Sequence, residues 1–114
     1  MRIIKKSLIN NLTQTPSTVI QEYLMEEDAI SGATAEIKGR YPEKGFAVNK
    51  ISKELVYIIK GRGEIITKEK ESEFGQGDVI FIDRDELFAW EGNFAMFMAT
   101  TPKFDPTQHV IIYD

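Results

Sequence analysis

The sequence predicts an all-β domain built as a barrel or a sandwich. Its apolar residues recur at alternate positions far more often than at the three- and four-residue spacing of a helix. Short apolar runs are separated by glycine, proline, asparagine and aspartate at intervals typical of all-β folds. With 114 residues, the chain is long enough for one domain with a buried core. Many short strands in so small a domain favour a closed or two-layered β-structure.

The predicted strands follow one another closely along the chain. They cover residues 19–24, 33–38, 46–50, 55–60, 64–69, 78–82, 87–91, 94–100 and 110–113. Gly61 and Gly63 separate two β-rich runs, and Gly77 precedes the apolar run 79–82. Glycine can adopt the positive φ that a chain reversal requires. We therefore expect a turn at residues 61–63.

The charge balance excludes several classes of partner. The chain has 14 lysines and arginines against 18 aspartates and glutamates, which gives a net charge of −4 at neutral pH. Proteins that bind phosphate backbones carry the opposite charge, so we expect no nucleic-acid partner. Apolar runs are only a few residues long, and no apolar leader ends in a cleavage site near the N-terminus. We therefore expect a cytoplasmic protein with no membrane partner.

Two residue counts restrict metal chemistry. The sequence has no cysteine and a single histidine, His109. Disulfides and thiolate metal sites are therefore excluded. A metal cage of several histidines cannot form within one chain.

Two segments, residues 45–61 and 77–92, carry a recognisable spacing. Gly45, Glu54 and Gly61 lie in the first segment, and Gly77 opens the second with the apolar run that follows it. In this spacing the chain resembles the cupin superfamily over roughly residues 33–101. The resemblance implies a cupin-type double-stranded β-helix, or jelly-roll barrel, with short N-terminal strands or an extension. It also implies that residues 1–114 form a single cupin domain.

The same resemblance locates the positions at which cupins hold a metal. The histidines of the first motif would fall on Val48 and Lys50, or on Ala47 and Asn49 in the alternative spacing, and Phe88 replaces the histidine of the second motif. Of the usual four ligands only the glutamate of the first motif remains, and one carboxylate cannot hold a divalent ion tightly. The resemblance therefore implies a metal-independent protein without a cofactor.

Side-chain parity predicts what lines the barrel and what covers its outside. If Glu54 faces the interior as its motif position implies, then Leu55, Tyr57 and Ile59 point outward. An apolar stripe on the outside needs a cover, which can be another sheet, the N-terminal segment or a second copy of the chain. We expect a homodimer.

The candidate site combines polar and aromatic side chains of the predicted interior. The predicted ligand-binding residues are Asn49, Glu54, Phe88, Trp90 and, at the rim, Arg40. Glu54 and His109 are the candidate catalytic residues, since a carboxyl or an imidazole can move a proton. Each of these residues also has a structural interpretation. Glu54 can be a polar group bonded to backbone, Phe88 and Trp90 can be aromatic residues of the core, and Asn49 can be a strand-end residue. Arg40 can lie in a solvated loop, and His109 can be a structural residue near a terminus.

Three functions fit these residues. The first is a binding protein that takes a small polar or sugar-like ligand inside the barrel. The second is a metal-free isomerase, epimerase or lyase of sugar or small-acid metabolism, as the resemblance permits, although the cupins of that kind use a histidine inside the barrel. The third is a structural or interaction module whose barrel is plugged by its own side chains. Fold alone does not choose among them.

Overall fold

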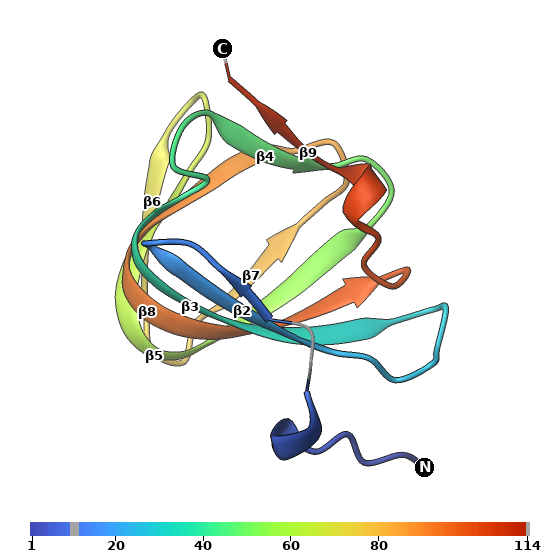
Figure 1. Ribbon diagram of the computed structural model, residues 1–114. Helices are drawn as coiled ribbons and strands as arrows, with labels where there is room; N and C mark the ends of the chain where they lie inside the picture. The colour runs from blue at the N-terminus through green and yellow to red at the C-terminus, as the bar shows by residue number, and fades with distance from the viewer. Residues whose placement is uncertain (10–11, 114) are drawn as a thin grey trace.

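The computed structural model describes residues 1–9 and 12–113, and β-strands make up most of it (Figure 1). No helix among these residues is long and apolar enough to cross a membrane. The elements are η1 (Lys6–Leu8), β1 (Leu12–Gln14), β2 (Thr18–Tyr23), β3 (Ser31–Tyr41), β4 (Phe46–Asn49), β5 (Lys53–Ile66), β6 (Glu71–Gly75), β7 (Val79–Ile82), β8 (Leu87–Thr101), η2 (Pro106–Gln108) and β9 (His109–Ile112).

The strands form one antiparallel, strongly curled sheet. The order β1-β2-β3-β8-β4-β9 runs along one path, and β5 pairs with β6, β7 and β8 off that path. The long strand β8 joins the two halves, because its first residues pair with β4 while most of its length lies between β3 and β5. Figure 1 shows the sheet curling around a central space. The prediction of an all-β barrel is confirmed.

Strand β5 has the two faces that its alternation predicted. Glu54, Val56 and Ile58 are buried, and the neighbours between and after them point outward. Leu55 is 52% exposed and Tyr57 48% exposed on that outer face. One face of β5 therefore lines the interior of the barrel, and the other is an uncovered apolar stripe.

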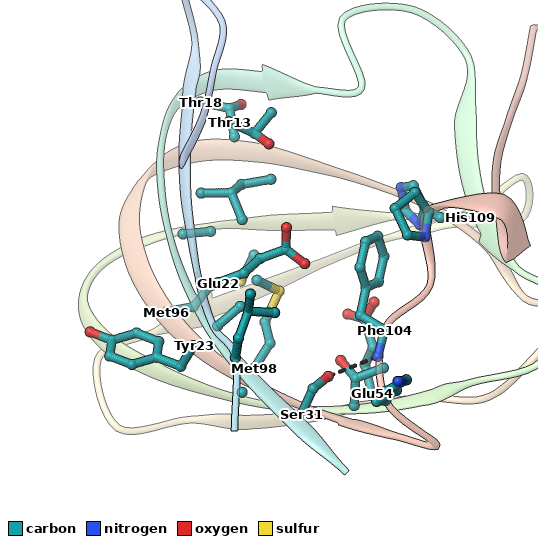
Figure 2. A pocket seen from close by; sticks show the side chains of 18 of the residues that line it. Thr13, Thr18, Glu22, Tyr23, Ser31, Glu54, Met96, Met98, Phe104 and His109 are labelled. Carbon is teal, nitrogen blue, oxygen red and sulfur yellow. Dashed lines mark hydrogen bonds between the residues drawn. The ribbon is translucent and has the colours of Figure 1, made fainter. Parts of the chain in front are cut away.

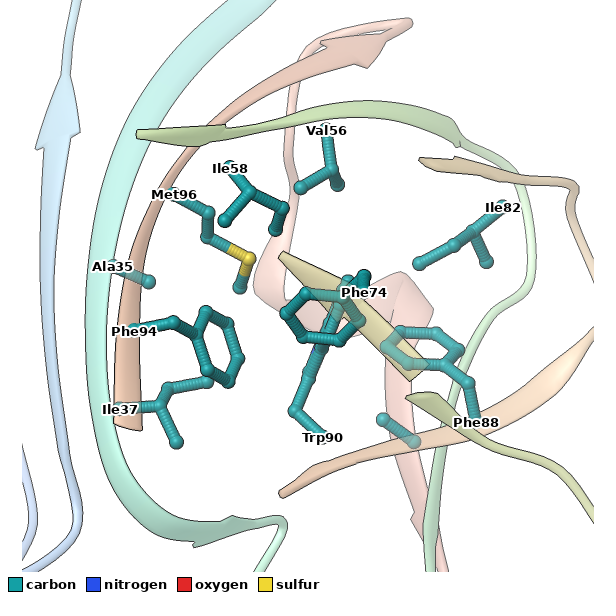
Figure 3. Close-up of a cluster of buried hydrophobic side chains, with 11 residues drawn as sticks. Ala35, Ile37, Val56, Ile58, Phe74, Ile82, Phe88, Trp90, Phe94 and Met96 are labelled. Carbon is teal, nitrogen blue, oxygen red and sulfur yellow. The ribbon is translucent and has the colours of Figure 1, made fainter. Parts of the chain in front are cut away.

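Aromatic side chains fill one part of the barrel interior. Trp90 packs edge to face against Phe74 at 5.6 Å and against Phe88 at 6.2 Å between ring centroids, and Phe94 also contacts Phe74 at 4.8 Å. Figure 3 shows these rings converging with aliphatic side chains of β3, β5 and β8. Burial of this many rings supplies much of the apolar driving force of so small a domain. The cluster also forms one wall of the space described below.

The predicted turn at residues 61–63 is wrong. Strand β5 runs without interruption through these positions and pairs with β8, with a β-bulge between Ile58 and Lys60. Gly61 has φ +82, and a Cβ there would lie 2.2 Å from the carbonyl oxygen of Asn93. Glycine is therefore needed here for the β-bulge and for the close approach of β5 to β8. Both require the same positive φ as a turn.

Other predicted boundaries also differ from the observed strands. The runs 55–60 and 64–69 belong to the single strand β5, which ends at Ile66, and the runs 87–91 and 94–100 belong to β8. The hairpin reverses at residues 67–70, where the Thr67 side chain accepts hydrogen bonds from the backbone N–H groups of Glu69 and Lys70. Strands β1 and β6 were not predicted, because β1 has three residues and β6 has a single large apolar residue, Phe74.

Candidate active site

The barrel contains a cavity of about 480 Å³. Side chains of β1, β2, β3, β5 and β8 line it, together with residues of the loop between β2 and β3 and of the C-terminal segment that follows β8 (Figure 2). Trp90, Phe88 and Met96 belong both to the aromatic core and to the cavity lining, so the core forms one wall of the cavity. The interior is therefore open. A structural or interaction module with a plugged barrel would have no such cavity.

Four polar residues meet in this region because of the strands that carry them. Tyr41 ends β3, Asn49 ends β4, Glu54 lies at the start of β5 and His109 begins β9. Asn49 and His109 are register partners in the β4–β9 pair, which places the tail histidine beside the asparagine. Pairing between strands far apart in the sequence therefore assembles the site.

Gln108 fixes the orientation of the polar side chains around it. Its Oε1 accepts hydrogen bonds from the backbone N–H groups of Ile51 at 3.0 Å and Ser52 at 3.1 Å, so its Nε2 is the end that donates. That Nε2 lies 3.2 Å from Asn49 Oδ1, which must therefore be the acceptor. The amide nitrogen of Asn49 is then left to donate to another group.

The remaining hydrogen bonds follow from this orientation. Asn49 Nδ2 donates to Glu54 Oε1 at 2.8 Å. His109 Nδ1 lies 2.8 Å from Asn49 Oδ1, an acceptor, so Nδ1 carries the proton. The other ring nitrogen, Nε2, is then an acceptor in the neutral ring, and the Tyr41 hydroxyl donates to it at 2.9 Å. The result is a continuous chain of hydrogen bonds, Tyr41–His109–Asn49–Glu54, which we call the relay.

Burial shifts the titration of three members of the relay. Desolvation raises the pKa of Glu54 above its ordinary value, and the hydrogen bond from Asn49 opposes that rise. Desolvation lowers the pKa of His109, which favours the neutral ring. The pKa of Tyr41 is raised by desolvation and, to a lesser extent, by the charge of Glu54. Each shift favours the uncharged form, so the relay holds one carboxyl acid, one imidazole base and one phenol close together.

The predicted site residues fall into two groups. Glu54, Phe88, Trp90 and His109 all line the cavity. Asn49 is fully buried behind the cavity wall, where its amide is bonded to the other relay members, so its position is that of an orienting residue and not of a ligand contact.

Arg40 does not lie in the cavity either. Its guanidinium donates to the backbone carbonyl of Pro42 at 2.7 Å and lies over the ring of Phe46, 5.8 Å from the centroid. Tyr41, the next residue on β3, points to the opposite face and lines the cavity. The side chain of Arg40, which was predicted to bind ligand at the rim, therefore lies outside the cavity lining.

Sequence reasoning selected Arg40 as the rim residue in preference to its neighbour Tyr41, and it missed Gln108 and Glu22 as members of the site. Tyr41 lies directly before the first motif, and Gln108 directly before the single histidine, but no local pattern indicates that these residues meet. Glu22 is the third inward residue of β2, after Thr18 and Ile20, and the alternation of that strand could have indicated its direction.

The residues at the motif positions do not fit the metal that the fold family implies. No group of three histidine, cysteine, aspartate or glutamate side chains lies close enough to hold an ion among residues 1–9 and 12–113. Of the residues in the relay, Asn49 uses its amide oxygen to accept from Gln108 and His109, and its nitrogen donates to Glu54. An amide engaged on both sides in this way offers no oxygen to a cation.

No protein-family model matches the sequence, and neither does any curated protein. Solved structures do resemble the chain. Pac13 of Streptomyces, described as a nucleoside dehydratase, superimposes with a TM-score of 0.85 at 13% identity, covering 100% of this chain and 94% of that one. A Pac13 variant solved with uridine gives a TM-score of 0.86, also at 13% identity, covering 100% of this chain and 93% of that one.

Two further structures carry other activities on the same architecture. Ectoine synthase from P. lautus gives a TM-score of 0.74 at 19% identity, covering 98% of this chain and 90% of that one. The polyketide cyclase RemF from Streptomyces resistomycificus gives 0.74 at 14% identity, covering 100% and 87%. Identities this low establish the fold and leave the activity open. The chain therefore has the cupin-type β-barrel fold that its two sequence segments predicted.

Proposed function

We propose that this protein is a metal-independent acid–base enzyme of the lyase or isomerase class, acting on a small hydroxylated, sugar-like compound inside the barrel. The observation that carries the proposal is the relay: an imidazole, a phenol and a carboxyl joined by oriented hydrogen bonds, three of them lining an open cavity. Cupins of this kind use a histidine inside the barrel, and β9 supplies one here.

The relay assigns a role to each group. Buried Glu54 has a raised pKa and acts as the proton donor, while neutral His109 accepts a proton through Tyr41. In an elimination, the substrate C–H proton passes to the Tyr41 oxygen as the phenol proton moves to His109 Nε2. Electrons of the C–H bond form the new double bond, the C–O bond breaks, and Glu54 protonates the departing hydroxyl to give water. In an isomerisation the same groups take a proton from one carbon and return one to a neighbouring atom.

The cavity walls support a ring-bearing substrate. Trp90 and Phe88 offer aromatic surface, and about 480 Å³ accommodates a compound the size of a nucleoside or a disaccharide. The likeness to a nucleoside dehydratase solved with uridine supports this class of compound as the first to be tried.

The test is to screen nucleosides, sugars and small hydroxy acids by thermal shift and to follow the binders by NMR for loss of water or rearrangement. Glu54→Gln keeps the shape and the bond from Asn49 but removes the acid, so we expect turnover to fall by about 10²-fold or more. Tyr41→Phe should lose turnover to a similar extent. The control Glu36→Gln changes an exposed carboxylate on the outer face of β3 and should keep full activity.

Two results would contradict this function. If Glu54→Gln retains the turnover of the wild type, the relay is not the catalytic group. If ligands bind and none is converted by any form of the protein, the chain is a binding protein, with the relay serving to orient the ligand.

The proposal includes a homodimer. The outer faces of β5, β7 and β8 carry six exposed apolar side chains: Leu55, Tyr57, Ile59, Val79, Phe81 and Phe97. The register places Leu55 beside Phe81 and Tyr57 beside both Val79 and Phe97, so these side chains form one continuous patch, which we call the apolar face. Monomeric proteins seldom leave such a patch in water, and a two-fold contact covers it with the same surface of a second copy.

A further inference from the structure

The cavity contains a second carboxylate that the relay does not use. Glu22 is an inward residue of β2, and Figure 2 shows its carboxylate projecting into the middle of the space, across from Phe104 and His109. Within residues 1–9 and 12–113, the structure gives this carboxylate no ion-pair partner. Desolvation in the cavity raises the pKa of Glu22, as expected for a carboxylate that lacks a nearby cation.

The charges that line the cavity are strongly unbalanced. Besides the protonated acid Glu54, three glutamates among the described residues contribute to the lining: Glu22, Glu26 and Glu27, of which Glu27 lies 4.0 Å from the Arg2 guanidinium. Among residues 1–9 and 12–113, Lys103 is the only lysine or arginine in the lining, and its ammonium lies 3.0 Å from the carboxylate of Asp28. His109 is held neutral by burial. A phosphate or carboxylate entering this cavity would meet like charges and lack a free cation, which disfavours its binding.

The sheet register gives the spacing between the two inward carboxylates. Glu22 pairs with Ala33 on β3, Ala33 with Met98 on β8, and Met98 with Val56 on β5, two residues from Glu54. The backbones that carry the two residues are therefore three strand spacings apart, about 14 Å along the curved wall, and are offset by two residues along the strands. A compound that touches both carboxylates must reach across the cavity.

We infer, on the basis of the proposed function, that the substrate carries a protonated amine that pairs with Glu22 while its hydroxylated end lies at Glu54 and Tyr41. A cation is the partner that a desolvated carboxylate with no neighbouring positive charge binds best. Glu22 is then the residue that selects the substrate by charge, and phosphorylated and acidic analogues are rejected.

Matched probes test this assignment. Two triads are used: uridine, 5′-amino-5′-deoxyuridine and uridine 5′-phosphate, and glucose, glucosamine and glucose 6-phosphate. Calorimetry and thermal shift measure binding to the wild type, Glu22→Gln and Glu22→Asp. The control is Glu26→Gln, which changes an exposed glutamate of the cavity lining. We expect the wild type to bind the amine of at least one triad about tenfold more tightly than its hydroxyl parent, with no binding of the phosphate. Glu22→Gln should abolish the preference for the amine, whereas Glu22→Asp and Glu26→Gln should keep most of it.

The outcomes separate this inference from the proposed function. Glu54→Gln, which should lose turnover, should still prefer the amine. If Glu22→Gln binds amine and hydroxyl forms in the wild-type ratio, Glu22 does not select the ligand, whatever Glu54→Gln does to turnover. A wild type that prefers phosphates, or that binds neither triad, overturns the inference as well. If the wild type prefers the amine but neither it nor any variant converts a ligand, Glu22 is supported as the residue that selects the ligand, and the relay has no catalytic role.

Discussion

At the scale of single residues, the positions of the protons in the site depend on Gln108, a side chain that does not line the cavity. Two backbone N–H groups hold its oxygen, and this choice determines which ends of Asn49 and His109 donate. A buried polar network of this kind specifies one arrangement because the alternatives leave two donors or two acceptors facing each other. None of the buried side-chain polar atoms in the described residues lacks a hydrogen-bond partner.

Glu54 should reduce the stability of the fold at neutral pH. Because burial raises its pKa above the unfolded value, the folded state binds the extra proton, and stability falls as pH rises through the folded pKa. Glu54→Gln removes that cost while keeping the bond from Asn49. We expect thermal melts to show the variant several degrees more stable than the wild type at pH 7–8, since ~1 kcal/mol corresponds to ~4 °C or more in a domain of this size.

The gain should disappear in acid, where the wild-type carboxyl is already protonated. A gain that is equal at pH 4 and pH 8 would show that packing, and not ionisation, separates the two proteins. Loss of stability at every pH would mean that the carboxylate is held by a favourable interaction.

The expected pH dependence of turnover follows from the pKa shifts of His109 and Glu54. His109 must be neutral, so activity should rise with pH through a His109 pKa that burial places below its ordinary value. Glu54 must be protonated, so activity should fall as pH rises through its elevated pKa. The rate profile should therefore be bell-shaped, and in Glu54→Gln the residual activity should lack the alkaline fall. A variant that keeps that fall would assign it to another group.

Only part of this site could be predicted from the sequence. Glu54 was identified because it occupies a motif position with fixed spacing, and its strand alternates regularly. His109 is near neither motif, and its place in the cavity depends on the pairing of β9 with β4, which no local periodicity encodes. Tyr41 and Arg40 are adjacent on β3, and successive side chains of a strand point to opposite faces. An error of one residue in the predicted alternation therefore exchanges the residue that faces the cavity.

At the scale of elements, the two long strands β5 and β8 are continuous where the sequence suggested interruptions. Both contain glycines with positive φ, Gly61 at +82 and Gly92 at +149, at the place where the two strands cross closely. A glycine of this kind is compatible with a turn or with a bulge, and only the partner strand decides between them. The alternation of apolar residues in β5 was correctly predicted, because it depends on the local pleat alone.

The bulge makes Gly61 intolerant of a side chain. In Gly61→Ala the new Cβ would lie 2.2 Å from the Asn93 oxygen and 2.7 Å from the Phe94 Cα, at a φ that alanine adopts poorly. We expect a loss of at least ~2 kcal/mol in the free energy of unfolding, measured by urea denaturation. The matched control is Gly75→Ala in β6, where a Cβ meets nothing within 4 Å. Equal stabilities of the two variants would contradict this account of the bulge.

At the scale of the whole molecule, the apolar face is a continuous surface of large apolar side chains that the fold leaves in contact with water. Its residues are 40% to 61% exposed, and they lie on three adjacent strands. The side chains contribute on the order of 500 Å² of apolar surface, which approaches the area that one partner buries in a standard interface. The face is large enough to hold two copies together.

Sedimentation should therefore show a dimer at micromolar concentration. Tyr57→Lys places a charge near the centre of the apolar face and should yield a folded monomer, since burying an unpaired charge at an interface is costly. Tyr113→Lys alters a 74%-exposed residue outside that face and should leave the dimer intact. A wild-type monomer, or a dimer that withstands Tyr57→Lys, would place the contact elsewhere.

The strand pairings that assemble the relay also govern how the chain reaches its folded state. Ser31 pairs with Thr100 and Phe46 pairs with Ile112, so strands more than 60 residues apart must meet before either pair forms. Chains dominated by such distant contacts fold in milliseconds to seconds, because the entropy of closing long loops is lost before the contacts compensate for it. His109 reaches Asn49 only through the β4–β9 pair. Partly folded forms that lack this pair therefore have no relay, and the proposed activity should appear during refolding only after β9 has paired with β4.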